Sequence, residues 1–270
     1  MSTRISFRFK SEKKAEDLTS YTKAIRFQGN GFCVALYHPE EKELLLLEEH
    51  LFEEDYPLNG KMRQLAEVTG QWQTGGLTRF ICFNTCNTQI PRPLFDSQNK
   101  VLYLQMITEQ PYHFIPVEEE VNPFDAYTLS GWDKNLYHEA LALYPECHMQ
   151  SGLCLLLHML ARQEGEKKMA AFVEDSCLNI AAEREGKLLG ANRFPFQNSN
   201  DFLYFLTGFA HTLFGDIRNV KLYFGGNVEI QSQLYTATQK YFPQMSLIAS
   251  AFPQLPQEQH RYCDLLYGGE

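Results

Sequence analysis

The sequence predicts an α/β protein in which one plan, β-β-β-α-β-α-β, occurs twice in tandem. Short apolar runs alternate with segments whose apolar residues recur every three or four positions, and turn-forming residues separate them. The same order of signals appears twice along 270 residues, a length typical of about two domains. A meander of three strands forms one edge of such a sheet, and later crossovers add parallel strands covered by helices.

The second copy has the clearer pattern. A hairpin turn is expected at Glu185–Lys187, and Asn198 or Ser199 can cap the helix that follows, because their side-chain oxygens accept free backbone N–H groups. In order, we expect strands over 168–173, 178–184 and 188–196, a helix carrying apolar residues from 202 to 214, a strand over 220–224, a helix from about 230 to 242, and a strand over 245–249.

The first copy follows the plan more loosely and is interrupted by an insert near residues 99–132. We expect strands over 24–27, 32–37, 44–47 and 79–83, a helix over 58–68, the start of a helix at 91–95, insert strands over 101–107, 112–117 and 126–129, and helices around 136–143 and 153–160. The acidic run Glu118–Glu120 is expected in a solvated loop. We place the boundary near residue 165, which gives an N-terminal subdomain over 1–165 and a C-terminal subdomain over 166–270.

Four segments carry a resemblance to a known family. They are Gly29–Tyr37 (GNGFCVALY), Arg184–Leu189 (REGKLL), Asn198–Phe209 (NSNDFLYFLTGF) and Val220–Asn227 (VKLYFGGN). With them the chain resembles a bacterial family of unknown function, DUF3822, over nearly its whole length. The plan resembles the ribonuclease-H-like fold, and two such subdomains in tandem form the actin-like ATPase architecture. Sugar kinases, heat-shock chaperones, and cytoplasmic pilus-assembly and secretion proteins share that architecture.

The resemblance implies two hairpin loops that would cradle phosphates. Glycine in such a loop lets backbone N–H groups converge on phosphate oxygens, and an acidic residue positions hydrated Mg²⁺. The corresponding turns are Gly29-Asn30-Gly31, which has glycines without an acid or hydroxyl, and Glu174-Asp175-Ser176, which has acids and a hydroxyl without glycine. Each turn holds half of the requirement, which favours ordinary hairpin turns over a working ATPase site.

Gly225-Gly226-Asn227 is the third candidate for nucleotide contact. It follows a predicted strand, at the end where open α/β sheets bind ligands, and in the superfamily a Gly-Gly at this point approaches the adenosine. The alternative is a tight β–α turn that needs a positive φ, with Asn227 as a helix cap.

A metal site is a weaker hypothesis. Cys154 and His158 share a helix face, and Cys147 and His148 lie close by in sequence, but the spacing matches no established zinc motif. Leucines surround the pair, so we expect core residues and no metal. No Gly-x-Ser-x-Gly motif is present to mark a serine nucleophile.

Charge and cysteine content narrow the functional classes. The net charge of -9 argues against nucleic-acid binding. Seven cysteines, odd in number and irregularly spaced, indicate reduced thiols and a cytoplasmic protein. No run of about 18 apolar residues predicts a membrane span, and the N-terminus lacks the apolar stretch of a signal peptide.

We therefore expect a non-catalytic interaction or scaffold module with a protein partner and no cofactor. The alternative is a nucleotide-binding ATPase or kinase-like enzyme, with Asp175 or Glu174 on Mg²⁺ and Gly225-Gly226 on the base of ATP. Aromatic residues of the insert and the tail, among them Tyr262 and Tyr267, would either form an interface or pack between the two halves. The oligomeric state stays open.

Overall fold

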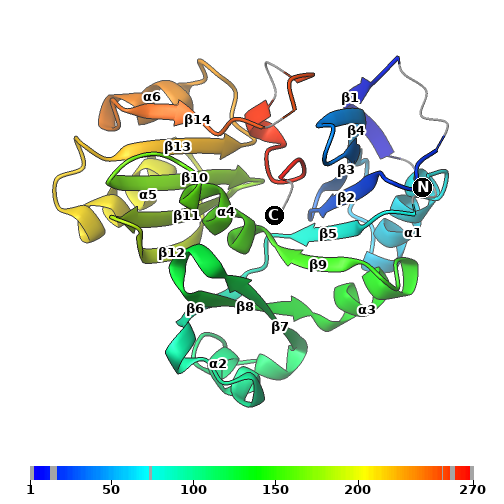
Figure 1. Cartoon of the computed structure of the whole chain (residues 1–270), viewed down its shortest axis with the longest axis horizontal. Coiled ribbons are helices and arrows are strands. Elements are labelled where there is room, and N and C mark those ends of the chain that lie inside the picture. The colour runs from blue at the N-terminus through cyan, green and yellow to red at the C-terminus, as the bar shows by residue number, and fades with distance from the viewer. Residues whose placement is uncertain (1–2, 13–16, 73–74, 251, 256–258, 268–270) are drawn as a thin grey trace.

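The computed structural model describes residues 3–12, 17–72, 75–250, 252–255 and 259–267. Within these ranges the strands form three sheets: one of six strands, one of five and one of three (Figure 1). The six-stranded sheet draws its strands from residues 3–151, and the five-stranded sheet from residues 167–247. The strands of these two sheets thus fall on either side of residue 165.

The first sheet has the order β1-β4-β3-β2-β5-β9. Its strands are β1 (Thr3–Lys10), β2 (Thr22–Phe27), β3 (Gly31–His38), β4 (Glu43–Phe52), β5 (Thr78–Cys82) and β9 (His148–Ser151). The antiparallel meander β2-β3-β4 comes first, and β5 and β9 then add in parallel, as predicted. Strand β1 pairs with β4 at the edge. It was not predicted, although its residues alternate between charged and apolar.

The second sheet repeats this order as β12-β11-β10-β13-β14. Its strands are β10 (Lys167–Glu174), β11 (Cys177–Arg184), β12 (Lys187–Pro195), β13 (Lys221–Gly226) and β14 (Met245–Leu247). Helices α5 (Ser199–Phe214) and α6 (Gln233–Tyr241) make the crossovers. The complete plan predicted for this half is confirmed.

The insert forms the third sheet, with the order β6-β8-β7. It contains β6 (Cys86–Pro91), β7 (Phe114–Val121), β8 (Ala126–Asp133) and α2 (Lys100–Gln105). The strand predicted over 101–107 is wrong: its apolar residues do not alternate, and the segment forms helix α2, which buries only Leu104. The helix predicted to start at 91–95 is reduced to a 3₁₀ turn at Arg92–Leu94 after β6.

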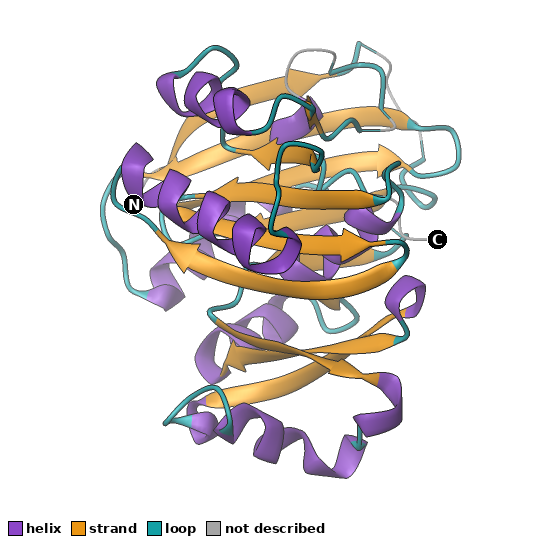
Figure 2. Ribbon diagram, turned by 90° about the vertical axis from the view of Figure 1, so that its left-hand side faces the viewer, coloured by secondary structure: helices purple, strands orange, loops and turns teal. Residues whose placement is uncertain are grey.

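The helices divide the core into layers. Helices α1 (Leu58–Thr69) and α3 (Lys134–Leu143) pack on the outer face of the first sheet, and α5 and α6 pack on the outer face of the second. Helix α4 (Gly152–Ala161) lies in the central cluster, where leucines around its whole circumference contact residues of both sheets. Figure 2, seen from the side of α5 and α6, shows the insert sheet as a separate layer below the second sheet.

Candidate functional site

The predicted site turns come together in the fold. The β2–β3 turn carries Asn30, whose side chain hydrogen-bonds the Asp175 carboxylate in the β10–β11 turn. The backbone N–H of Asn227, after β13, donates to the Val173 carbonyl of β10 at 2.7 Å. The three segments that the sequence singled out therefore meet at one end of the two sheets.

The glycines of these turns differ in what they accommodate. At Gly226 the φ angle is +86°, and a Cβ would lie 2.1 Å from the Val173 carbonyl oxygen. A Cβ on Gly31 would lie 2.1 Å from the His50 carbonyl oxygen, whereas one on Gly29 would meet no atom within 4 Å. At Gly225 a Cβ would lie 3.2 Å from the His260 carbonyl oxygen. Neighbouring strands thus approach Gly226 and Gly31 so closely that no side chain fits there. Gly225 faces the C-terminal segment.

The acidic residues of the second turn already have protein partners. Glu174 is buried and accepts a hydrogen bond from Arg193 at 3.1 Å. Burial raises the pKa of Glu174 to about 7, against the opposing effect of Arg193. Burial also raises the pKa of Asp175, which Arg26 and Asn30 partly offset. Ser176 is exposed at the tip of the turn.

The C-terminal segment, residues 259–267, lies between the two sheets (Figure 1). Its Asp264 carboxylate accepts a hydrogen bond from the Arg26 guanidinium of β2 at 2.7 Å, and both side chains are almost completely buried. Arg26 also donates to the Arg261 carbonyl at 3.1 Å and lies between the rings of Phe172 and Tyr262. A residue of the first sheet thus holds the last described segment of the chain.

A second buried arginine holds the same segment. Arg79 of β5 donates to the Leu265 carbonyl at 3.0 Å and to the Tyr37 hydroxyl at 2.7 Å. Its Nε donates to the Gln150 side chain at 2.6 Å. On the other side of the segment, His260 contacts the Val228 carbonyl at 2.7 Å, just after β13. The segment therefore bonds to both sheets.

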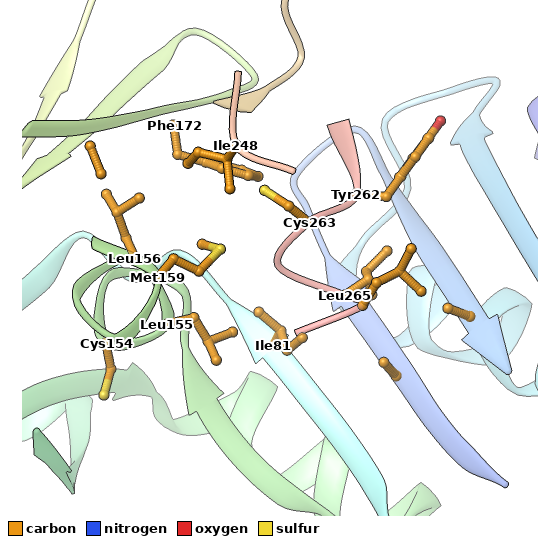
Figure 3. Close-up of a cluster of buried hydrophobic side chains, with 14 of the residues drawn as sticks. Ile81, Cys154, Leu155, Leu156, Met159, Phe172, Ile248, Tyr262, Cys263 and Leu265 are labelled. Atoms are coloured by element: carbon orange, nitrogen blue, oxygen red, sulfur yellow. The ribbon is translucent and has the colours of Figure 1, made fainter. Parts of the chain in front are cut away.

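Apolar side chains complete this packing. Figure 3 shows Cys263 beside Phe172 and Ile248 of the second half, while the Tyr262 side chain points the other way, where its ring lies 5.2 Å from that of Phe7 in β1. Leu155, Leu156 and Met159 of α4 line the opposite side. The open alternative for the tail tyrosines is resolved for Tyr262, which packs between the two halves and has no exposed surface. The Arg162 guanidinium lies 4.5 Å from the centroid of the Tyr267 ring, and Tyr267 packs against the same cluster.

Sequence reasoning missed the buried and half-buried charged residues that lie between the two halves. Arg26, Arg79 and Arg193 are charged residues within strands that are otherwise largely apolar, and Asp264 lies between Cys263 and Leu265. A charge inside a buried strand is rarely left unpaired, so these positions carried a signal for buried ion pairs. The partners lie up to 238 positions apart in sequence, which periodicity does not reveal.

The residues of the metal hypothesis lie elsewhere, near the start of α4. Cys154 is buried beside the Glu119 carboxylate, and His158 contacts the Glu120 carbonyl at 3.2 Å. In the ranges that the structure describes, no three His, Cys, Asp or Glu side chains are placed to hold a metal. All seven cysteines are free thiols.

The loop predicted at Glu118–Glu120 is wrong, because these residues belong to strand β7. Glu118 pairs with Lys100 and Glu120 with Arg92, while the Glu119 carboxylate turns inward and accepts the Ser151 backbone N–H at 2.9 Å. Burial raises the pKa of Glu119 from its ordinary 4.5 to about 8. Alternation within a strand explains why one of three consecutive acids is desolvated.

The solved structures that are similar to this chain include the following two. One is a Bacteroides thetaiotaomicron protein with actin-like ATPase fold and unknown function, with a TM-score of 0.69 and 21% identity, covering 85% of this chain and 91% of that one. The other is the PilM-PilN type IV pilus biogenesis complex, with a TM-score of 0.55 and 9% identity, covering 91% of this chain and 96% of that one. These matches show the actin-like ATPase fold.

Two further findings concern membranes and curated proteins. None of the helices in the described ranges combines the length and apolar character that a membrane crossing requires. A comparison with curated proteins found no match to this chain. The model of the family described as "Protein of unknown function (DUF3822)" matches residues 10–245, and the chain belongs to that family.

Proposed function

We propose that this protein is a non-catalytic interaction module, an actin-like fold whose central cleft is occupied by its own C-terminal segment. The observation that carries the proposal is the pair between Arg26 and Asp264, which fixes this segment between the two sheets. The segment covers Gly225, the glycine that the superfamily resemblance would place against adenosine.

The chemistry of the turns supports the same proposal. A magnesium site needs carboxylate oxygens that are ionised and free to bind the ion. Glu174 is committed to Arg193, and its raised pKa of about 7 favours the protonated form more than an ordinary glutamate would. Asp175 is engaged by Asn30. Both acidic side chains of this turn therefore have partners within the protein, which leaves them less free to bind an ion.

The surface supports a role in binding other proteins. Eleven large hydrophobic side chains are exposed in the described ranges, and six of them lie in one stretch of 19 residues in the insert, 94–112. These six are Leu94, Val101, Leu102, Met106, Ile107 and Tyr112. We call them the insert patch. Clustered exposed apolar side chains are typical of interaction sites. A protein of this fold also takes part in the PilM-PilN complex, at 9% identity to this chain.

Thermal unfolding with Mg-ATP tests the nucleotide alternative. A ligand present at 100 times its Kd adds about 2.7 kcal/mol to the free energy of unfolding, which is several degrees in Tm. We expect no shift in Tm at millimolar Mg-ATP. A shift that disappears in Asp175→Asn and persists in Asp201→Asn, a matched half-buried carboxylate on α5, would overturn the proposal.

A retention experiment tests the interaction role. The tagged full-length chain is cross-linked in the organism that encodes it, together with the double variant Leu102→Glu/Met106→Glu and the control Tyr204→Glu. Tyr204 is 73% exposed on α5, away from the insert patch. We expect a partner that the wild type and Tyr204→Glu retain and the double variant loses. A chain that retains no partner would contradict the proposal.

A further inference from the structure

A groove of about 550 Å³ lies between the insert and the second sheet. One wall consists of the first half of β12 and the turn before it, residues 186–191. The other wall consists of Gln89 and Pro91 of β6, together with the β7–β8 turn at 122–126. Every lining residue belongs to the described ranges. The volume is within the range of protein pockets that bind ligands.

The groove runs between two strands that are each paired on one side only. Strand β12 is the outer strand of the second sheet and pairs with β11, and β6 is an outer strand of the insert sheet and pairs with β8. In both views the insert sheet lies below β12 (Figures 1 and 2). An outer strand presents backbone N–H and C=O groups along its free side, and these can pair with an added strand.

The two strands approach each other at one end of the groove. There the Arg193 guanidinium of β12 donates to the Phe83 carbonyl, three residues before β6 begins. At the other end the walls are two turns with residues in left-handed conformations, Asp125 at φ 49° and Gly186 at φ 78°. The groove is thus bridged by a side chain at one end and bounded by tight turns at the other.

The walls combine apolar side chains with an unsatisfied donor. Leu188, Ala191 and Phe124 are partly buried and line the groove. The side-chain nitrogen of Gln89 is buried, and the described residues provide it with no hydrogen-bond partner. A buried donor without an acceptor is unfavourable, and a backbone carbonyl entering the groove would satisfy it.

We infer that this groove binds an extended peptide of a partner protein, which adds as a strand to β12 and places an apolar side chain against Leu188 and Phe124. Main-chain hydrogen bonds would provide affinity, and the apolar contact would provide specificity. The inference rests on the proposed function and names a class of partner for it.

Other occupants fit the groove less well. A second copy would have to bring the edge of a whole sheet into a groove of about 550 Å³ that the insert bounds on its other side. The net charge of -9 opposes a nucleic acid or an anionic lipid surface. A peptide needs room for one strand only, and it needs no basic surface.

A selected peptide is the direct probe. A phage-displayed library of random 12-residue peptides is selected on the full-length chain, and the enriched peptides are synthesised for titration. We expect sequences with alternating apolar residues. On binding, amide hydrogen exchange should slow in residues 187–191, because the peptide pairs with this part of β12.

Three variants locate the site. Ala191→Arg places a long side chain in the groove and should weaken binding at least tenfold. Asn192→Arg adds the same side chain at the next residue, which is exposed and does not line the groove, and should change binding less than twofold. Gln89→Met keeps the side-chain length but removes the donor, and should weaken binding about threefold to tenfold while thermal stability stays unchanged or rises.

Two results would overturn the inference: the library yields no binder, or its binders tolerate Ala191→Arg and Gln89→Met as well as Asn192→Arg. Either result leaves the Mg-ATP and retention experiments to decide the proposed function separately. A Tm shift with Mg-ATP alongside peptide binding in the groove would overturn the proposed function and leave the groove intact.

Discussion

At the scale of single residues, the cleft depends on charges that are buried and paired. Arg26 and Asp264 have 4% and 0% of their side-chain surface exposed. Removing ions from water is costly, so such a pair contributes less to stability than its short distance suggests. Removing one partner is more harmful than removing both, because the remaining ion is buried without compensation.

Asp264→Asn therefore has a predictable cost. We expect the free energy of unfolding to fall by about 3–5 kcal/mol, because the Arg26 guanidinium stays charged and buried. The double variant Arg26→Met/Asp264→Leu should lose less than the two single variants combined. Urea denaturation measures all of them.

An exposed pair provides the control for this experiment. Arg63 and Glu67 form an i, i+4 pair on α1, and both side chains are largely exposed. Glu67→Gln should cost about 0.5 kcal/mol or less. If Asp264→Asn cost no more than this, the segment at 259–267 would not be fixed by its carboxylate.

Glu119 makes stability depend on pH in a defined direction. Its pKa in the folded state is about 8, above the ordinary 4.5, so the folded protein holds a proton that the unfolded chain has lost between these values. Stability then falls as the pH rises from about 4.5 to 8. Glu119→Gln removes this loss and keeps an oxygen that can accept the Ser151 N–H.

The expected gain appears only at high pH. Because Glu119 is half-buried, water reduces the effect, and we expect Glu119→Gln to be more stable than the wild type by on the order of 1 kcal/mol at pH 9. Near pH 4.5 the two proteins should be equal. Urea midpoints measured across this range provide the comparison, and a difference that does not vary with pH would contradict the assignment.

At the scale of elements, the pattern of apolar residues predicted the helices and strands that pack an apolar face in the core. The five strands and two helices of the second half follow from alternation, turns and helical spacing, and each is present. Helix α2 did not follow, because only Leu104 of its side chains is buried, while Val101 and Leu102 are exposed. Where a side chain's environment is solvent, the periodicity that marks a buried face is lost.

The turns that the sequence singled out come together in the fold, but the residues that pack between the two sheets beside them were missed. Turn residues such as Asn30 and Asp175 stand out in the sequence because glycine, asparagine and acids have special backbone and capping roles. The C-terminal segment shows no periodicity, and Asp264 resembles an ordinary surface acid until Arg26 is placed beside it. A pairing across 238 residues depends on the fold and is not encoded locally.

The cap of α5 allows a test at this scale. The sequence left Asn198 and Ser199 as alternatives, and in the structure Asn198 accepts the N–H groups of Asn200 and Asp201 at 2.9 and 3.1 Å. Asn198→Ala should lower the free energy of unfolding by about 1 kcal/mol. Ser199→Ala should change it by less than about 0.5 kcal/mol, and denaturant midpoints distinguish the two. Equal effects would contradict the assigned cap.

At the scale of the whole molecule, the two halves share a buried core. Helix α4 packs on both sheets, and Arg193 of β12 donates to the Phe83 carbonyl. The segment at 259–267, which follows the last strand of the second sheet, forms hydrogen bonds with strands of the first sheet. Two domains joined only by a linker unfold separately, whereas halves that share a buried core are expected to unfold together.

Cooperative unfolding can be measured because the two tryptophans, Trp72 and Trp132, both belong to the half before residue 165. Their fluorescence follows that half, while far-UV circular dichroism follows both. In the wild type we expect the two urea transitions to coincide, since loss of either sheet exposes α4 and the C-terminal segment. In Asp264→Asn both should shift to lower urea together. A circular dichroism transition in two steps, with fluorescence following only one, would show that the shared core does not couple the halves.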